Sequence, residues 1–494
     1  MAKRIIPRLL SSRAGDALFA IVIRLLYADR LRSWIVRLAS ARLRAGLDVA
    51  PRLPSADVRL GREHRLMALA VLHTVDRLVA RGILAPEVAR VIATLWGRAL
   101  CSAFLSVRPP LLQRFRAKHG RDPPWFLTIS PDHACNLRCT GCYASSAVDP
   151  TAQDARLTWP VLDRIMAEAQ ESWGVGLFVF SGGEPLLYRS QGRGILDAVE
   201  KHSDCLYLMF TNGTLIDRAV ADRLAEIGNL TPAISVEGLR RRTDARRGAG
   251  VFDRALEAMA HLRAVGVPFG ISVTVTRANA EEILSDAFLD LFFKDQGAFY
   301  GFLFHHMPIG VGAREGLDLV PTPAQRLALW RRTWEVIEAR RIFVFDFWNS
   351  GPLVHGCVSA GRERGYLYID WNGKVMPCVF APYAVANIHE VYAQGGTLQD
   401  VWEAPFLRAI RRWQRAYGYG CDGPSAGGNW LRPCPIRDHY ALFREWVARH
   451  QPEPEDEAAR GALSDEAYTE WMVAYGEELG ALSQPIWEEE YLRR

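Results

Sequence analysis

The sequence lacks any apolar run long enough to cross a bilayer. A membrane-spanning helix needs about 20 consecutive apolar residues, and the best candidate, Ala17–Ala28, is interrupted by Arg24 and followed by Asp29. No small-residue cleavage site of the signal-peptide kind follows it. We therefore expect a cytoplasmic protein, with peripheral contact to a membrane surface left open.

Cysteine and net charge are also sparse. Nine cysteines in 494 residues are too few and too clustered for a secreted disulfide scaffold. The chain has 60 Lys/Arg and 55 Asp/Glu, a net charge of +5, which argues against nucleic acid as its partner. The charge is unevenly distributed, because residues 1–122 contain 23 of the basic and only 8 of the acidic residues.

Both ends of the chain have a distinct character. Apolar residues at helical spacing predict a basic, amphipathic helical domain over residues 1–122. Its Arg-rich helices could rest on an anionic membrane surface. Alternatively, their apolar face packs against the rest of the protein and their arginines face the solvent. Residues 451–494 carry 12 Asp/Glu and 3 Arg, which predicts a solvated acidic segment with docked aromatic anchors.

Residues 123–321 alternate short β-branched or aromatic runs with amphipathic stretches. Six such runs predict strands: Trp125–Ser130, Gly176–Ser181, Cys205–Thr211, Pro232–Val236, Phe269–Thr276 and Phe299–His305. Strands joined by helices predict an α/β fold, specifically a partial (βα)6 TIM-like barrel with its chemistry at the carboxyl ends of the strands. Residues 322–450 predict a small, irregular cysteine-bearing domain.

Three cysteines follow the first predicted strand with the spacing C-x3-C-x2-C, at Cys135, Cys139 and Cys142. Three thiolates can bind three irons of a cubane cluster and leave the fourth iron open for a substrate or cofactor. A structural zinc would need a fourth nearby ligand, and His133 stands at an unusual spacing for that role.

The second predicted strand ends in Ser181-Gly182-Gly183-Glu184-Pro185. Two glycines allow a close approach to the backbone, and a carboxylate can hold an ammonium group. Together with the cysteine triplet and the aromatic Tyr143 behind it, this motif closely resembles the radical S-adenosylmethionine (radical SAM) superfamily.

The resemblance assigns roles to further residues. It implies that Cys135, Cys139 and Cys142 bind a [4Fe–4S] cluster to which SAM attaches. It also implies a set of SAM contacts: Tyr143 near the adenine, Gly182, Gly183 and Glu184 at the ammonium, Thr211 and Asn212 of a T-N-G motif, Ser235 and Glu237 where S-x-D-G is usual, and Arg247 at the carboxylate. The stretch from Asp244 to Phe252 resembles D-x-x-R-G-x3-F of the peptide- and sulfatase-modifying branch.

A second cysteine group resembles the opening of the SPASM auxiliary-cluster domain. Cys357 and Cys378 form C-x15-G-x4-C, and Cys421 and Cys434 follow, fewer than a full SPASM domain contains. Four cysteines suffice for one auxiliary [4Fe–4S] cluster, or for three ligands and an open site without Cys421. A structural zinc on the same four is the alternative.

Two residues near the predicted barrel opening are candidates for proton transfer, His305 at the sixth strand and Asp346 before the auxiliary region. A structural role is the alternative for each. The sequence thus predicts a radical SAM enzyme that abstracts hydrogen from an unactivated C–H bond, with flavodoxin or ferredoxin as the expected low-potential electron donor. We favour a lipid or other hydrophobic metabolite as substrate, with a peptide as the alternative, and a non-catalytic iron–sulfur carrier as the alternative of another class.

Overall fold

The computed structural model describes residues 25–45, 55–104, 110–144, 155–309, 316–419 and 427–492. Cys421 lies outside these residues, so its predicted role as a ligand is not addressed by the structure. Among the described helices, none combines the length and hydropathy that crossing a membrane requires.

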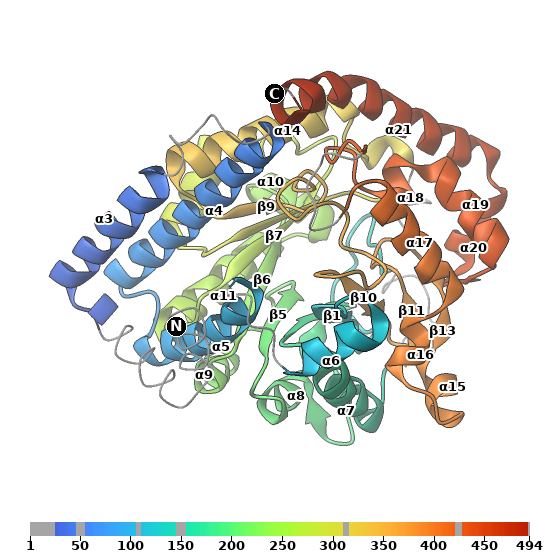
Figure 1. The fold of residues 1–494 in the computed structure, drawn as a ribbon. Coiled ribbons are helices and arrows are strands. Elements are labelled where there is room, and N and C mark those ends of the chain that lie inside the picture. The colour runs from blue at the N-terminus through green and yellow to red at the C-terminus, as the bar shows by residue number, and fades with distance from the viewer. Residues whose placement is uncertain are drawn as a thin grey trace.

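The N-terminal region is helical throughout its described part, as the sequence predicts (Figure 1). Its helices are α3 (Asp29–Ala45), α4 (Ser55–Ala80), α5 (Pro86–Phe104) and α6 (Pro110–His119). Helices α3 and α4 lie side by side, and α4 also contacts the last helical turn of the chain, η6 (Glu488–Leu492). The N-terminal domain is therefore joined to the C-terminal end.

The core of the protein is one sheet of ten strands in the order β13-β11-β10-β1-β2-β5-β6-β7-β8-β9. The six predicted strands are all present as parallel neighbours: β1 (Phe126–Ile129), β2 (Leu177–Phe180), β5 (Leu206–Thr211), β6 (Leu230–Val236), β7 (Gly270–Val275) and β8 (Gly301–His305). This arrangement confirms an α/β fold with a partial barrel.

Two further parallel strands extend the predicted six. Strand β9 (Val344–Asp346) pairs with β8, and β10 (Tyr366–Ile369) pairs with β1 on the other side. Strands β11 (Lys374–Met376) and β13 (Ala386–Asn387) continue the sheet in antiparallel fashion. The sheet therefore takes strands from residues 322–450, the region in which the sequence predicts a separate small domain.

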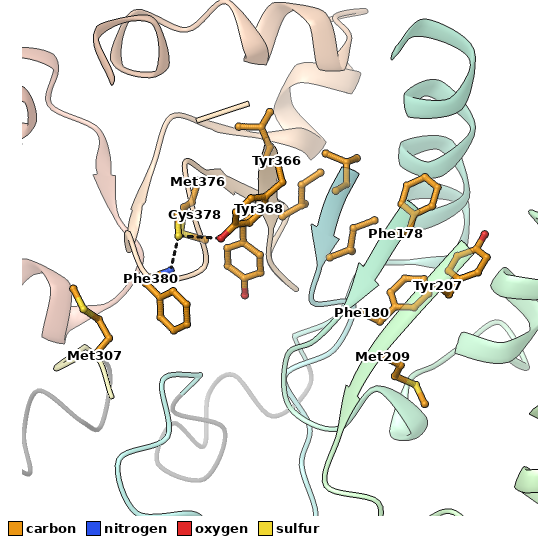
Figure 2. Packing of buried hydrophobic residues seen from close by; sticks show 14 of the residues in the cluster. Phe178, Phe180, Tyr207, Met209, Met307, Tyr366, Tyr368, Met376, Cys378 and Phe380 are labelled. Atoms are coloured by element: carbon orange, nitrogen blue, oxygen red, sulfur yellow. Dashed lines mark hydrogen bonds between the residues drawn. The ribbon is translucent and has the colours of Figure 1, made fainter. Parts of the chain in front are cut away.

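Helices cover the outside of the barrel. They are α7 (Trp159–Glu168) with η1 (Ala169–Trp173), α8 (Ile195–Lys201), α9 (Arg218–Ile227), α10 (Arg240–Arg247), α11 (Val251–Val265), α12 (Asp286–Leu289) with η3 (Asp290–Asp295), and α14 (Pro323–Glu335) with η5 (Val336–Arg340). Beneath them the outward side chains of the strands form the main core. Figure 2 shows one part of it, where Tyr207 stacks on Phe178 and Phe180.

The C-terminal third is largely helical (Figure 1). Its helices are α15 (Ile388–Ala393), α16 (Leu398–Trp402), α17 (Pro405–Ala416), α18 (Pro435–Asp438), α19 (Tyr440–His450), α20 (Glu457–Ser464) and α21 (Glu466–Trp487). The acidic segment predicted to be solvated mostly forms α21, which packs on α14, α18 and α19. Three aromatic residues are the predicted anchors of this segment: Tyr475 and Trp487 are buried, and Trp471 is half-buried.

The strand register fixes which side chains face the barrel interior. Phe210 on β5 contacts Phe302 and Phe304 on β8 with ring centroids 5.9 and 5.3 Å apart. Since β6 and β7 separate these two strands in the sheet, the contact crosses the interior. Alternation along each strand then places His305, the neighbour of Phe304, on the outer face.

Candidate functional site

The loop after β1 holds the cysteine triplet against the carboxyl ends of the strands. The pKa of the Cys135 thiol is raised to about 12, chiefly by burial and further by Glu184 and by the neighbouring thiols of Cys142 and Cys139. The three thiols thus lie within electrostatic reach of one another. No three His, Cys, Asp or Glu side chains of the described residues converge as they would around a single metal ion.

Gly182 and Gly183 let this loop approach the end of β2. A Cβ on Gly183 would lie 2.1 Å from the carbonyl oxygen of Ala134, and one on Gly182 would lie 2.7 Å from that of Asp132. The Gly183 and Glu184 amides donate hydrogen bonds to the same two carbonyls, at 3.1 and 2.7 Å. The two glycines thus make room for the cysteine loop, and their contact with a ligand stays a prediction.

Glu184 is buried and aligned by its neighbours. Its Oε1 accepts hydrogen bonds from the Thr211 hydroxyl at 2.7 Å and the Leu186 amide at 3.2 Å, and its Oε2 accepts one from the Asn212 amide at 2.8 Å. Burial raises the pKa of Glu184 although these donors and Arg247 act against it. A carboxylate offers about four acceptor positions, so Oε2 retains one for an ammonium group.

Glu237 follows β6 and binds two arginines. Its Oε1 accepts from Arg246 Nη1 at 2.6 Å and from Arg247 Nε at 2.7 Å, while Oε2 accepts from the Thr274 amide at 3.1 Å. The side chain of Glu237 is 1% exposed. Glu237 thus orients both arginines. The direct contact with SAM that the sequence suggests for Glu237 stays a prediction.

The two arginines reach the cysteine loop. Arg247 Nη1 lies 3.9 Å from Cys139 Sγ, and Arg246 Nη2 donates to the Gly141 carbonyl at 3.2 Å. The Thr140 amide in turn donates to the Arg246 carbonyl at 3.0 Å. Arg247 was identified from the sequence, but Arg246 was missed. The position of Arg246 directly before Arg247 in the sequence was a signal that could have identified it.

The other predicted SAM contacts surround the same loop. The Tyr143 hydroxyl hydrogen-bonds Ser181 Oγ at 2.6 Å and accepts from the Gly182 amide at 3.3 Å. Asn212 Nδ2 lies 4.0 Å from Cys135 Sγ. Ser235 lies on β6 and is buried. The structure thus gathers the predicted residues around one loop, and their contacts with SAM stay predictions.

This donor set fits a cluster with bound SAM. Three thiols grouped at one loop match three cluster ligands. Glu184 keeps a free acceptor position, and Arg247 lies close enough to influence its ionisation. A carboxylate can accept hydrogen bonds from the ammonium group of an amino acid, and a guanidinium can bind its carboxylate. This site contains both groups.

Two of the auxiliary cysteines, Cys357 and Cys378, lie near Tyr366. The Tyr366 hydroxyl donates to Cys378 Sγ at 2.9 Å, a contact visible in Figure 2. The pKa of Cys434 is raised well above its usual range, mainly by burial and further by Asp438, Cys357 and Cys378. The three described cysteines of this group thus lie within electrostatic reach of one another, although they do not converge as the ligands of a single metal ion would.

Arg362 organises the loop that carries Cys357. Its Nη2 donates to the carbonyls of Val354 at 2.9 Å, His355 at 3.0 Å and Gly356 at 3.3 Å, and its Nε donates to that of Cys357. A guanidinium held by several carbonyls of one turn fixes that turn. Reading the sequence locally gave no indication of this role.

The structure brings His305 and Asp346 together but turns both away from the interior. His305 Nε2 lies 3.0 Å from Asp346 Oδ2, and Arg437 Nη2 lies 3.3 Å from His305 Nδ1. Asp346 also accepts from the Trp348 and Asn349 amides and from Asn349 Nδ2. Both imidazole nitrogens and both carboxylate oxygens thus already have hydrogen-bond partners. This supports the structural role that the sequence left as the alternative for each residue. Proton transfer by this pair stays a prediction.

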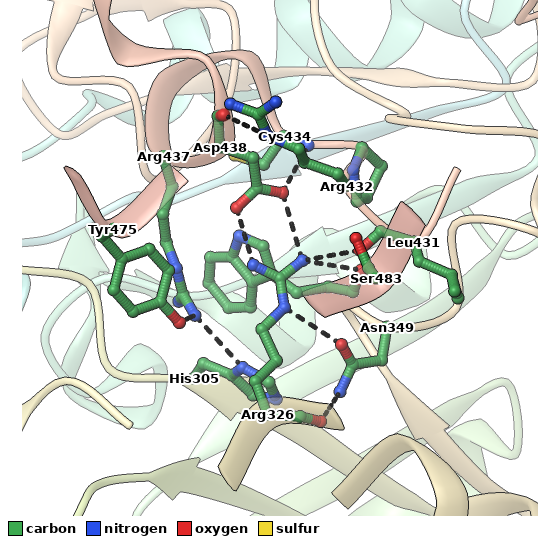
Figure 3. A network of polar contacts seen from close by, with 12 residues as sticks. His305, Arg326, Asn349, Leu431, Arg432, Cys434, Arg437, Asp438, Tyr475 and Ser483 are labelled. Atoms are coloured by element: carbon green, nitrogen blue, oxygen red, sulfur yellow. Dashed lines mark hydrogen bonds and ion pairs between the residues drawn. The ribbon is translucent and has the colours of Figure 1, made fainter. Parts of the chain in front are cut away.

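A buried polar network extends from that pair to the C-terminal helices (Figure 3). Arg326 on α14 binds Asp438 on α18 through Nη1 at 2.6 Å and Nη2 at 3.1 Å. Arg437 donates to the Tyr475 hydroxyl at 2.8 Å. The burial of Arg326, Arg437 and Asp438 is complete, so this network ties the outer wall of the barrel to α18 and α21.

The barrel interior has two kinds of wall. Ring contacts and strand register place a group of aromatic residues on and near β5, β8 and β9, the strands that flank β6 and β7: Phe210, Phe302, Phe304, Phe345, Phe347 and Phe380. The register places Ser235, Ser272 and Thr274 on the β6–β7 side. Several of the aromatic rings are only half-buried, so they offer apolar surface to a substrate.

Comparison with known proteins is consistent with this geometry. Residues 129–289 match the radical SAM superfamily, and residues 357–422 match the SPASM iron–sulfur cluster-binding domain. The chain is 30% identical over 383 residues to the mycofactocin maturase MftC of Mycobacterium ulcerans, covering 72% of this chain and 98% of that protein. It is 26% identical over 313 residues to the AdoMet-dependent heme synthase of Methanosarcina barkeri, covering 58% and 83%.

Solved structures with a similar fold include Streptococcus suis SuiB bound to its precursor peptide SuiA. The identity is 19% and the TM-score 0.48, over 64% of this chain and 72% of that one.

Proposed function

This chain belongs to the radical SAM superfamily, and on that premise we propose that it is a maturase that modifies a peptide or protein substrate. It is an enzyme that uses a SAM-binding [4Fe–4S] cluster, SAM and an auxiliary [4Fe–4S] cluster. The observation that carries the substrate class is the similarity to a maturase over 98% of that protein's length. The comparisons thus favour the peptide alternative over the lipid or hydrophobic metabolite that the sequence first suggested.

The residues of the first site have distinct tasks in this proposal. When bound, the cluster with SAM supplies a 5′-deoxyadenosyl radical for hydrogen abstraction. Cys135, Cys139 and Cys142 hold the cluster, Glu184 Oε2 accepts from the ammonium group, and Arg247 binds the carboxylate. Glu237 fixes Arg247 through its 2.7 Å contact with Nε.

The interior walls position the substrate. Aromatic rings on β5, β8 and β9 exclude water from the reacting C–H bond and pack against an apolar or aromatic side chain. The hydroxyls of Ser272 and Thr274 can hydrogen-bond to polar groups of the same substrate. Cys357, Cys378 and Cys434, with Cys421 as the candidate fourth ligand, would hold the auxiliary cluster, which would supply an electron acceptor or a binding site for the substrate.

The electron donor and the cellular location are part of the same proposal. A low-potential carrier such as flavodoxin or ferredoxin would reduce the first cluster. Such carriers are cytoplasmic partners, so we place the enzyme in the cytoplasm.

An anaerobic assay with reconstituted protein tests the function. We expect about eight irons per chain, four for each cubane, and 5′-deoxyadenosine after addition of SAM and dithionite. A pool of synthetic peptides should accelerate 5′-deoxyadenosine formation and should contain a peptide of changed mass, whereas a lipid extract should do neither.

The Cys142→Ala variant is the control, because it removes a predicted cluster ligand and should abolish 5′-deoxyadenosine formation. Acceleration by the lipid extract alone would restore the lipid substrate. If neither pool changes the rate while 5′-deoxyadenosine is still formed, the maturase assignment fails but the radical SAM chemistry stands.

A further inference from the structure

Helix α3 presents an apolar stripe to solvent. Trp34 is 55% exposed and Leu38 is 56% exposed, and both stand among the few large apolar side chains in the described residues that are so open. They are four residues apart, so they lie on one face of the helix. A single exposed leucine needs no explanation, but an exposed tryptophan beside it on the same face does.

Arginines flank this stripe on both sides. At 100° per residue, Arg30, Arg37 and Arg44 lie to one side of Trp34 and Arg42 lies beyond Leu38; all four are exposed. Within the described part of the chain, the acidic partners near α3 are Asp29 and Asp76, and both bind Arg32 on the buried side. The exposed arginines thus keep an uncompensated positive charge.

The positive charge of Arg44 also acts on His73 and Arg341, which lie next to α3. Burial, then Arg44, lowers the pKa of Arg341, and burial followed by Arg341, Arg44 and Arg77 lowers that of His73. Asp76 acts in the opposite sense on His73, and Glu338 does so on Arg341.

We propose that the α3 face formed by Trp34, Leu38 and the arginines that flank them docks onto an anionic phospholipid membrane. Tryptophan partitions to the headgroup level, where one end of its ring is apolar and the other polar. Helices that lie in the interface carry apolar residues along the centre of one face and arginines at its edges. The arrangement on α3 has this pattern.

Other occupants fit less well. The exposed stripe has two large side chains on one helix, whereas a stable protein interface buries roughly 800 Å² on each partner. Nucleic acid binding uses several stacking aromatics along a basic groove, and α3 offers one. The docking is a property of this surface, and it does not depend on which substrate the enzyme modifies.

Vesicle flotation of the full, reconstituted chain tests the proposal. The protein should float with vesicles of phosphatidylglycerol mixed with phosphatidylcholine, and it should stay behind with vesicles of phosphatidylcholine alone. Binding should weaken as salt is added, because exposed charges are screened.

Two variants separate the apolar and the charged parts. Trp34→Ser with Leu38→Ser should reduce the vesicle partition coefficient at least about tenfold, since both apolar side chains are lost. Arg30→Gln, Arg37→Gln and Arg42→Gln together should reduce it by about fivefold for each arginine. Iron content and 5′-deoxyadenosine formation show that each variant is folded.

Matched controls use exposed residues elsewhere. Leu482→Ser on α21 removes a leucine that is 41% exposed, and Arg254→Gln, Arg331→Gln and Arg412→Gln remove three exposed arginines from α11, α14 and α17. Both controls should float like the native protein. A control that lost binding to the same degree would show that net charge or general surface hydrophobicity is responsible.

Three results would overturn the proposal. The first is an absence of flotation with anionic vesicles at low salt. The second is flotation that the α3 variants do not change. The third is a concentration-dependent dimer, or binding to a DNA oligonucleotide, that the α3 variants abolish while vesicle binding persists.

Discussion

At the scale of single residues, one extra methylene changes what a carboxylate does. Aspartate is usual at the position of Glu237 in the related motif, and the longer side chain here reaches both Arg246 and Arg247. A charge shared by two guanidinia fixes Arg247, the arginine proposed to bind SAM, and Arg246, which donates to the cysteine loop. Glu237 is therefore a positioning residue.

Replacing Glu237 by glutamine should weaken SAM binding. The variant leaves two partly buried guanidinia without their anion, which costs about 3–5 kcal/mol for a broken buried pair, and Arg247 loses its orientation. We expect the KM for SAM to rise at least tenfold with a smaller change in kcat, measured by 5′-deoxyadenosine formation.

The conservative variant sharpens this test. Glu237→Asp keeps the charge but shortens its reach, so it should recover only part of the lost affinity. The exposed Glu226→Gln serves as the control and should leave the KM unchanged. An unaltered KM in Glu237→Gln would show that Arg247 needs no such support.

The same scale shows what the sequence could predict of the site. The spacing of Cys135, Cys139 and Cys142 and the position of Glu184 after a strand are local. The structure brings all four residues together where the loop after β1 meets the end of β2. The contact between His305 and Asp346 depends on the pairing of β8 with β9, which no local pattern reveals. Each residue was identified, but their mutual contact and their outward orientation were not.

At the scale of elements, the two ends of the chain meet through a buried acid. Glu63 on α4 accepts hydrogen bonds from the Tyr491 hydroxyl in η6 and from Arg59 Nε at 3.0 Å. Burial raises the pKa of Glu63 to about 7, although Arg59 and Tyr491 act to lower it. The contact between α4 and η6 is thus most stable when the Glu63 carboxyl is protonated.

The stability of the protein should therefore fall as the pH rises from about 4.5 to about 7 through this group. In that window the folded state binds more protons than the unfolded state, so the contribution of Glu63 decreases with rising pH. The difference is about 3 kcal/mol at most, at about 1.4 kcal/mol for each pKa unit. Melting temperatures at pH 5 and pH 8 should show it.

The Glu63→Gln variant should reduce this pH dependence, because its amide does not titrate in the window. Glu226→Gln is again a suitable control and should retain the native profile. A native pH profile in Glu63→Gln would mean that other groups dominate the dependence.

Elements also differ in how far sequence reasoning reaches. All six predicted strands exist because each is a run of β-branched or aromatic residues followed by an amphipathic helix. Strand β9 has three residues, too short for a periodic signal. The β10 strand was assigned to a separate domain because its partner β1 is distant in sequence, and pairing over such a distance leaves no local pattern.

At the scale of the whole molecule, a buried ion pair joins the barrel to the auxiliary region. Arg326 comes from the helix that leads into β9, and Asp438 follows Cys434 on α18. Asp438 Oδ2 also accepts from the Cys434 amide at 3.0 Å. The pair thus links a helix of the barrel to the segment that positions Cys434.

The Asp438→Asn variant should destabilise the whole protein. An uncompensated buried guanidinium costs about 3–5 kcal/mol, so the melting temperature should fall by several degrees and auxiliary-cluster iron should be lost together with it. Thermal unfolding and iron counting measure the two effects.

Asp222→Asn is the matched control, because Asp222 pairs with Arg218 at 2.9 Å on an exposed helix. Exposed pairs contribute about 0–1 kcal/mol, so this variant should melt near the native temperature. Equal effects of the two substitutions would contradict a special role for the buried pair.

The pairing of β1 with β10 has a consequence for synthesis of the chain on the ribosome. Phe126 pairs with Tyr366, so the open edge of β1 acquires its neighbour only after about 240 further residues have been translated. At roughly 5–20 residues per second this takes about 10–50 s. During that interval the nascent barrel exposes an unpaired strand beside three free thiols. Cells that make this protein should need chaperone protection and iron–sulfur loading that are timed to follow release of the finished chain.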